Sequence, residues 1–212
     1  AARDRSLAPT LLGGAEPHRI PHPKVRMALK ATIFKAQLQI ADIDRNVYLD
    51  HAVTIARHPS ENDERMMMRL LALALNIPSD DHNGQLDLGK GLSDVDEPDL
   101  AHADLTGRIL HWIELGQPDD KRLQRASSKS DEVTVYSYAN STPIWWAAIE
   151  NKLSRLGKVA VWQIPADQSQ ELARLAERSM RWQVTVQDGV CYVNTGKDTV
   201  EITPRLLRAR AL

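Results

Sequence analysis

The chain has 212 residues, with 42% hydrophobic and 26% charged side chains, a formal net charge of −1 and one cysteine, Cys191. A chain of this length can bury a core without disulfides or structural metals, and one cysteine excludes an intramolecular disulfide. The near-neutral charge disfavours broad, charge-driven DNA binding, and no apolar run approaches the ~20 residues that span a bilayer. We therefore expect a cytoplasmic protein without membrane association, and we favour a monomer.

The first 26 residues differ from the rest of the chain. They hold five basic residues against two acids, a net charge of +3, which leaves −4 for the remainder. Four prolines and two adjacent glycines interrupt them, and they show no hydrophobic period. This pattern is typical of a disordered extension or of a start placed upstream of the true one. We expect a single α/β domain over residues 27–212.

The folded part begins with two strands and a helix. Alternating apolar residues predict a strand over 29–40, with a bulge near Phe34 where the alternation changes parity, and a half-buried strand over 47–55. Ser60 is the predicted N-cap of a helix that ends before Pro78. The chain therefore opens with a β-hairpin followed by a helix.

Strands and helices alternate over the remainder of the chain. The nearly continuous apolar run at 109–115 predicts a central strand covered on both faces, and Asp188-Gly189 predicts a tight hairpin. The predicted elements are strands at 85–89, 109–115, 133–138 and 159–164, helices at 119–129, 142–156 and 169–179, and a hairpin that joins 182–186 to 190–193. This order predicts an α/β fold with one mixed central sheet flanked by helices.

Acidic residues on apolar faces are the informative feature. Glu64 is aligned with the buried stripe of its helix, and Glu114 shares the parity of Trp112 in the apolar strand. A buried carboxylate costs several kcal/mol unless it is paired, protonated or bound to metal. The structural alternative for Glu64 is an ordinary acid at a helix N-terminus. For Glu114 the alternatives are an arginine partner, such as Arg65 or Arg108, or exposure at the end of the strand.

A third acidic group is the turn at 96–99, which contains Glu97 and Asp99. Two or three converging carboxylates would form an oxygen site suited to Mg²⁺ or Mn²⁺, which polarises a phosphoryl oxygen and generates a hydroxide nucleophile. Gln117 and Lys121 follow Glu114 and could orient water or stabilise charge. An ordinary acidic turn is the alternative for 96–99.

A basic stripe lies on the predicted helix at 119–129. Lys121, Arg125 and Lys129 are four residues apart, so they share one face of the helix. This face could contact a phosphate backbone. The alternative is a solvated helix surface, which is the usual meaning of such a charge run.

Several stretches after residue 26 are distinctive: MALKATI (27–33), ARHPSE (56–61), ERMM (64–67), RLLA (69–72), DEP (96–98) and WIELG (112–116), followed by Pro118. Through these stretches, the chain from Met27 onward resembles the bacterial YaeQ family over essentially its whole remaining length. The resemblance implies a variation of the PD-(D/E)XK restriction-endonuclease-like core, in which Glu64, Glu97 or Asp99, and Glu114 would be the metal ligands. The core carries a lysine two residues after the strand acid, where this chain has Gly116.

Two functions follow from these observations. The first is a nuclease-like, metal-dependent phosphodiesterase, in which Glu114, Gln117 and Lys121 act on the phosphoryl group while Mg²⁺ or Mn²⁺ is bound. The second is a non-catalytic scaffold with the nuclease fold that interacts with nucleic acid or with the transcription machinery, to which members of the family have been linked. The absence of a lysine at Gly116 favours the second hypothesis, and the costly placement of Glu114 favours the first.

Overall fold

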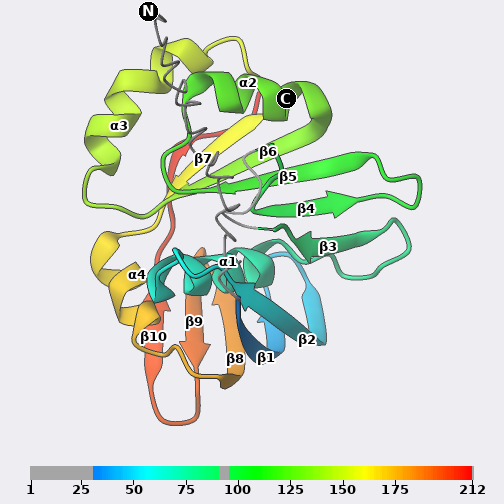
Figure 1. Cartoon of the computed structure of the whole chain (residues 1–212), viewed down its shortest axis with the longest axis vertical. Helices are drawn as coiled ribbons and strands as arrows, with labels where there is room; N and C mark the ends of the chain where they lie inside the picture. The colour runs from blue at the N-terminus through cyan, green and yellow to red at the C-terminus, as the bar shows by residue number, and fades with distance from the viewer. Residues whose placement is uncertain (1–30, 91–95, 212) are drawn as a thin grey trace, which may run out of the picture.

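A computed structural model describes residues 31–90 and 96–211 (Figure 1). The predicted extension at 1–26 lies outside these residues. Within them the chain forms an α/β fold with four α-helices and two mixed sheets. The expectation of one central sheet is therefore wrong. Helices are sandwiched between the two sheets, so each sheet has one face in a shared core.

The first sheet, sheet A, has five strands in the order β10-β9-β8-β1-β2. Strands β1 and β8 are parallel and the other neighbours are antiparallel. From Phe34 onward, every second side chain of β1 points inward, and the β1–β2 register is continuous. The predicted bulge is therefore absent from this pair. The strands are β1 (Thr32–Asp42), β2 (Val47–Arg57), β8 (Ser179–Gln187), β9 (Val190–Asn194) and β10 (Thr199–Ile202).

The second sheet, sheet B, has six strands in the order β11-β7-β6-β5-β4-β3. The three central strands, β5, β6 and β7, are parallel, as their continuous apolar character predicts. The strands are β3 (Gln85–Leu88), β4 (Leu100–Ala103), β5 (Ile109–Leu115), β6 (Ser130–Ser137), β7 (Val159–Gln163) and β11 (Arg205–Arg208).

Helix α1 (Asp63–Asn76) lies between the sheets and is buried without interruption from Met66 to Ala74. It contacts β1 of sheet A and β3, β4 and β5 of sheet B, and Figure 1 shows it at the centre of the molecule. Asn62 is its N-cap, with Oδ1 accepting from the backbone N of Arg65 at 2.8 Å, so the predicted cap at Ser60 is two residues early. Unbranched methionines fill this crowded position well.

The other helices complete the two cores. Helices α2 (Asp120–Lys129) and α3 (Thr142–Ile149) cover the face of sheet B that points away from α1, where Trp112 and Leu123 are buried. A 3₁₀ helix, Glu150–Leu153, replaces the end of the helix predicted at 142–156. Helix α4 (Ala166–Ala173) packs beside α1.

The predicted helix at 169–179 therefore starts and ends too late. Its last residue, Ser179, is the first residue of β8, which pairs with Lys35 of β1. The next hairpin matches the prediction: Asp188 and Gly189 join β8 to β9 with φ values of 54° and 75°. Over the described residues, none of the helices is long and apolar enough to cross a membrane.

Candidate functional site

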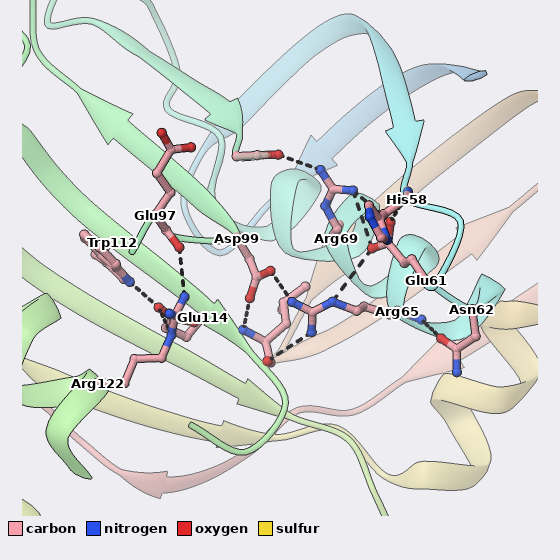
Figure 2. Close-up of polar contacts among 12 residues, drawn as sticks. His58, Glu61, Asn62, Arg65, Arg69, Glu97, Asp99, Trp112, Glu114 and Arg122 are labelled. Carbon is pink, nitrogen blue, oxygen red and sulfur yellow. Dashed lines mark hydrogen bonds and ion pairs between the residues drawn. The ribbon is translucent and has the colours of Figure 1, made fainter. Parts of the chain in front are cut away.

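A network of ion pairs surrounds the first two turns of α1 (Figure 2). Glu61, Arg65 and Arg69 are spaced four residues apart, so their side chains lie along one face of the chain as it enters the helix. Arg69 is 2% exposed, and its Nη1 lies 3.2 Å from Glu61 Oε2. Its Nη2 donates to the carbonyl oxygen of Gly89 at 2.8 Å. Arg69 thereby ties α1 to the segment that follows β3.

Asp99 is a second buried acid in this network and is 3% exposed. Its Oδ1 forms an ion pair with Arg65 Nη2, and its Oδ2 accepts from the backbone N of Leu115 at 2.7 Å. Burial disfavours the charged form of Arg65, but Asp99, Tyr138 and Glu61 together outweigh it and raise the Arg65 pKa. Both oxygens of Asp99 are thus used to join α1 to β5.

Glu114 is 2% exposed and is buried on the face of sheet B that packs against α2. Its Oε1 accepts from Trp112 Nε1 at 2.5 Å and lies 2.8 Å from Arg122 Nε of α2. Burial raises the pKa of the Glu114 carboxyl above its ordinary value, while the hydrogen bonds from Arg122 and Trp112 oppose that shift. Arg122 also donates to the carbonyl oxygen of Glu97 at 2.8 Å, so it links α2 to the 96–99 turn.

The other two predicted acids have different partners. Glu64 Oε1 accepts from Ser169 Oγ of α4 at 2.6 Å, so this carboxylate joins the two inner helices. The carboxylate of Glu97 lies at the surface and pairs with Lys90, at 2.7 Å from Nζ. Of the two candidates in the 96–99 turn, Asp99 points into the network, and Glu97 contributes only its backbone oxygen.

The structure does not gather these acids around one point. Glu114 has the parity of Trp112, which packs toward α2, whereas Ile113 and Leu115 pack toward α1, where Glu64 lies. Sheet B therefore separates Glu114 from Glu64. Among residues 31–90 and 96–211, no three His, Cys, Asp or Glu side chains are grouped so that they could hold a metal ion.

The bonding of Asp99 and Glu114 also disfavours a divalent cation. Arg65 and Arg122 hold cationic nitrogens at the oxygens that Mg²⁺ or Mn²⁺ would need, and hard cations require several free oxygens in a near-regular arrangement. The residues present do not fit a preformed site for either ion. Metal binding stays a prediction, and it would require both arginines to move.

Gln117 and Lys121, the predicted catalytic residues other than Glu114, form no hydrogen bond or ion pair with the acids among the described residues. Gln117 Nε2 donates to Ser141 Oγ at 2.8 Å, just before α3, and Lys121 is exposed on α2. Gly116 has a φ of +93°, a backbone conformation that L side chains rarely adopt, and a Cβ built on it would lie 4.0 Å from Arg65 Nη1. The backbone at position 116 thus favours glycine.

The predicted site contains the acids of this region but lacks most of the residues that pair with them. Glu61 and Arg69 were not singled out, although the spacing Glu61, Arg65, Arg69 was a usable signal for one charged row. Arg65 was considered as a partner of Glu114 but pairs with Asp99 instead. Arg122 takes that role from the following helix.

Comparison with known proteins gives a consistent picture. Residues 27–204 match the family model described as YaeQ protein. The chain is 41% identical over 178 residues to the YaeQ protein of Salmonella typhi and 40% identical to that of Escherichia coli K12, in each case covering 83% of this chain and 95% of the relative.

Two solved structures share the fold. The crystal structure of YaeQ from Xanthomonas axonopodis pv. citri has a TM-score of 0.79 and 40% identity, covering 86% of this chain and 99% of the other. That of YaeQ from Pseudomonas syringae has a TM-score of 0.78 and 37% identity, covering 85% and 97%. The chain belongs to the YaeQ family.

Proposed function

We propose that this protein is a non-catalytic scaffold that works by binding a partner, with nucleic acid or the transcription machinery as the partner class. In this proposal Glu64, Asp99 and Glu114 occupy the positions of metal ligands in a PD-(D/E)XK-like core but stabilise the fold instead. The observation that carries the proposal is the pairing of both buried acids with arginines: Asp99 with Arg65 and Glu114 with Arg122.

The backbone at Gly116 supports the same proposal. Nuclease chemistry needs a cation close to the developing charge, and the core motif supplies it as a lysine. A lysine at this position would be strained, since a φ of +93° costs a non-glycine residue of order 1–3 kcal/mol. Neither Gln117 nor Lys121 forms a hydrogen bond or ion pair with Asp99 or Glu114 among the described residues, so neither replaces it.

The rival function is a metal-dependent phosphodiesterase. One observation favours it: the raised pKa of Glu114 means that this acid is kept in the interior at a cost. Perturbed acids are more frequent at functional sites than elsewhere. In that case Mg²⁺ or Mn²⁺ would displace Arg65 and Arg122, and the ligands would be Glu64, Asp99 and Glu114.

Calorimetric titration with Mn²⁺ separates the two functions. We expect no binding heat from the wild-type protein or from Glu114→Gln, and no cleavage of single- or double-stranded DNA or RNA in Mg²⁺ or Mn²⁺. Glu150→Gln, which alters an exposed acid of the 3₁₀ helix, is the control for nonspecific cation binding. Heat that is present in wild type and in Glu150→Gln but lost in Glu114→Gln would replace the scaffold proposal with the metal-dependent one.

A further inference from the structure

The outer face of sheet A carries a continuous groove. A cavity of about 420 Å³ and a second of about 270 Å³ share Gln37 and Arg181, and the second shares Gln39 and Gln183 with a third of about 490 Å³. The shared residues join the three into one depression. We call it the sheet-A groove; it runs along β1 and β8, from Lys35 and Ser179 at one end to Ala41 and Thr185 at the other.

One end of this groove is cationic. Four basic side chains line the first cavity against two acids, Glu177 and Asp198. Within the described residues, none of the four takes part in an ion pair or a side-chain hydrogen bond. The four cations are Lys35, Arg174, Arg181 and Lys197. They leave a local excess of positive charge on a protein whose total charge is −1.

The middle and the far end have different chemistry. Side-chain amides line the middle. Tyr48, which is 60% exposed, and the acidic residue Asp50 line the third cavity. The β-sheet register fixes the order, because Gln37 pairs with Arg181, Gln39 with Gln183, and Ala41 with both Tyr48 and Thr185. From Lys35 to Ala41 the strand advances ~20 Å at ~3.3 Å per residue. The amides are those of Gln37, Gln39, Gln183 and Asn194.

We infer that the sheet-A groove binds single-stranded nucleic acid. The unpaired cations contact phosphates, the amides hydrogen-bond base edges, and Tyr48 offers a ring on which a base stacks. A local site of this kind agrees with a near-neutral protein, because it needs a few phosphate contacts and no broad basic surface. This inference rests on the proposed binding function and names its partner and its surface.

A rival basic surface exists on α2 and provides a matched control. Arg125 and Lys129 are exposed there, and no side-chain partner is described for either. The variant Arg125→Ala/Lys129→Ala removes one arginine and one lysine, as does Lys35→Ala/Arg181→Ala in the groove. The two double variants have the same net charge, so a difference between them reports position and not total charge.

Fluorescence anisotropy with a labelled oligouridylate tests the inference, using a length of about 12 nucleotides, within the ~4–16 bound by comparable modules. We expect Lys35→Ala/Arg181→Ala to bind about tenfold more weakly than wild type and Arg125→Ala/Lys129→Ala to stay within about twofold. Tyr48→Ala should also weaken binding about tenfold, through lost stacking. Excess uridine monophosphate should fail to displace the oligomer, since it supplies one phosphate and one base.

Several outcomes overturn the inference. Equal loss in the two double variants, or loss only in the α2 variant, moves the site elsewhere. Unchanged binding in both assigns it to another segment, such as the basic residues 1–26. No binding by wild type contradicts the inference outright, and displacement by uridine monophosphate points to a nucleotide site. None of these results concerns metal binding, so the Mn²⁺ titration judges the scaffold proposal separately.

Discussion

The interior network around α1 and the groove on sheet A differ in whether their charged side chains are buried and paired. In the network, Asp99 and Glu114 are almost fully buried, and each has an arginine at hydrogen-bonding distance. In the groove, basic side chains such as Lys35 and Arg181 are exposed and make no described ion pair. The buried acids need their partners, whereas the cations of the groove form no ion pair within residues 31–90 and 96–211.

This difference separates structural charge from charge that is available to a ligand. A carboxylate taken out of water must be paired, because an unpaired buried charge costs several kcal/mol. An exposed lysine or arginine has no such requirement, so four of them around one cavity are not explained by stability. The acids are the informative residues in the sequence, but in the fold they are already paired. The exposed cations are the charges that remain available to a ligand.

The largest effect is expected for Asp99→Ala. This change leaves the Arg65 guanidinium and the backbone N of Leu115 without their carboxylate, so the free energy of unfolding should fall by about 3–5 kcal/mol. Urea unfolding followed by circular dichroism measures this. Asp99→Asn, which keeps one acceptor oxygen, should lose less. A stability loss below 1 kcal/mol in Asp99→Ala would mean that the network does not hold the fold together.

A smaller and pH-dependent effect is expected for Glu114→Gln. Glutamine keeps an acceptor for Trp112 and removes the buried charge, so at neutral pH the change should stay within about 1.5 kcal/mol. Because the pKa of Glu114 is raised in the folded state, its stabilising contribution is full below the ordinary value and is lost as pH rises. The free energy of unfolding of the variant should therefore rise relative to that of wild type between about pH 4 and about pH 7.

Unfolding curves collected across that pH range, with Glu150→Gln as the exposed control, test the sign of this effect. If the stability of Glu114→Gln instead falls relative to wild type as pH rises, the pairing with Arg122 outweighs burial. Glu114 would then be a stabilising ion-pair partner.

The smallest effect is expected for the groove variant Lys35→Ala/Arg181→Ala. Both side chains are exposed and neither has a described partner, so the free energy of unfolding should change by less than about 0.5 kcal/mol per site. The same denaturant titration measures it. A large loss would show that these cations support sheet A and would weaken their assignment to a ligand.

Local patterns predicted much of the secondary structure. The apolar run that gives β5 and the Asp188-Gly189 turn were found because their signals depend only on neighbouring residues. The short strands β4, β10 and β11 were missed, since four residues carry little periodicity. The second sheet was also missed, because the parallel pairing of β1 with β8 joins segments that are far apart in sequence.

The same limit applies to the candidate site. Parity placed Glu114 inside the protein correctly, but choosing between Arg65, Arg108 and Arg122 as its partner required the packing of α2 on sheet B. Arg108 lies at the surface and pairs with Asp131. The left-handed backbone at Gly116 could not be predicted either, since a glycine in a sequence does not reveal its φ.

The position of α1 has a consequence for how the protein can come apart. One helix provides the inner surface for sheet A and for sheet B at once, and its side chains are buried from Met66 to Ala74. Neither sheet can be released without exposing that helix to water, so the two halves cannot open as independent units. The backbone amides of α1 should therefore be among the last to exchange with deuterated solvent, and only through complete unfolding.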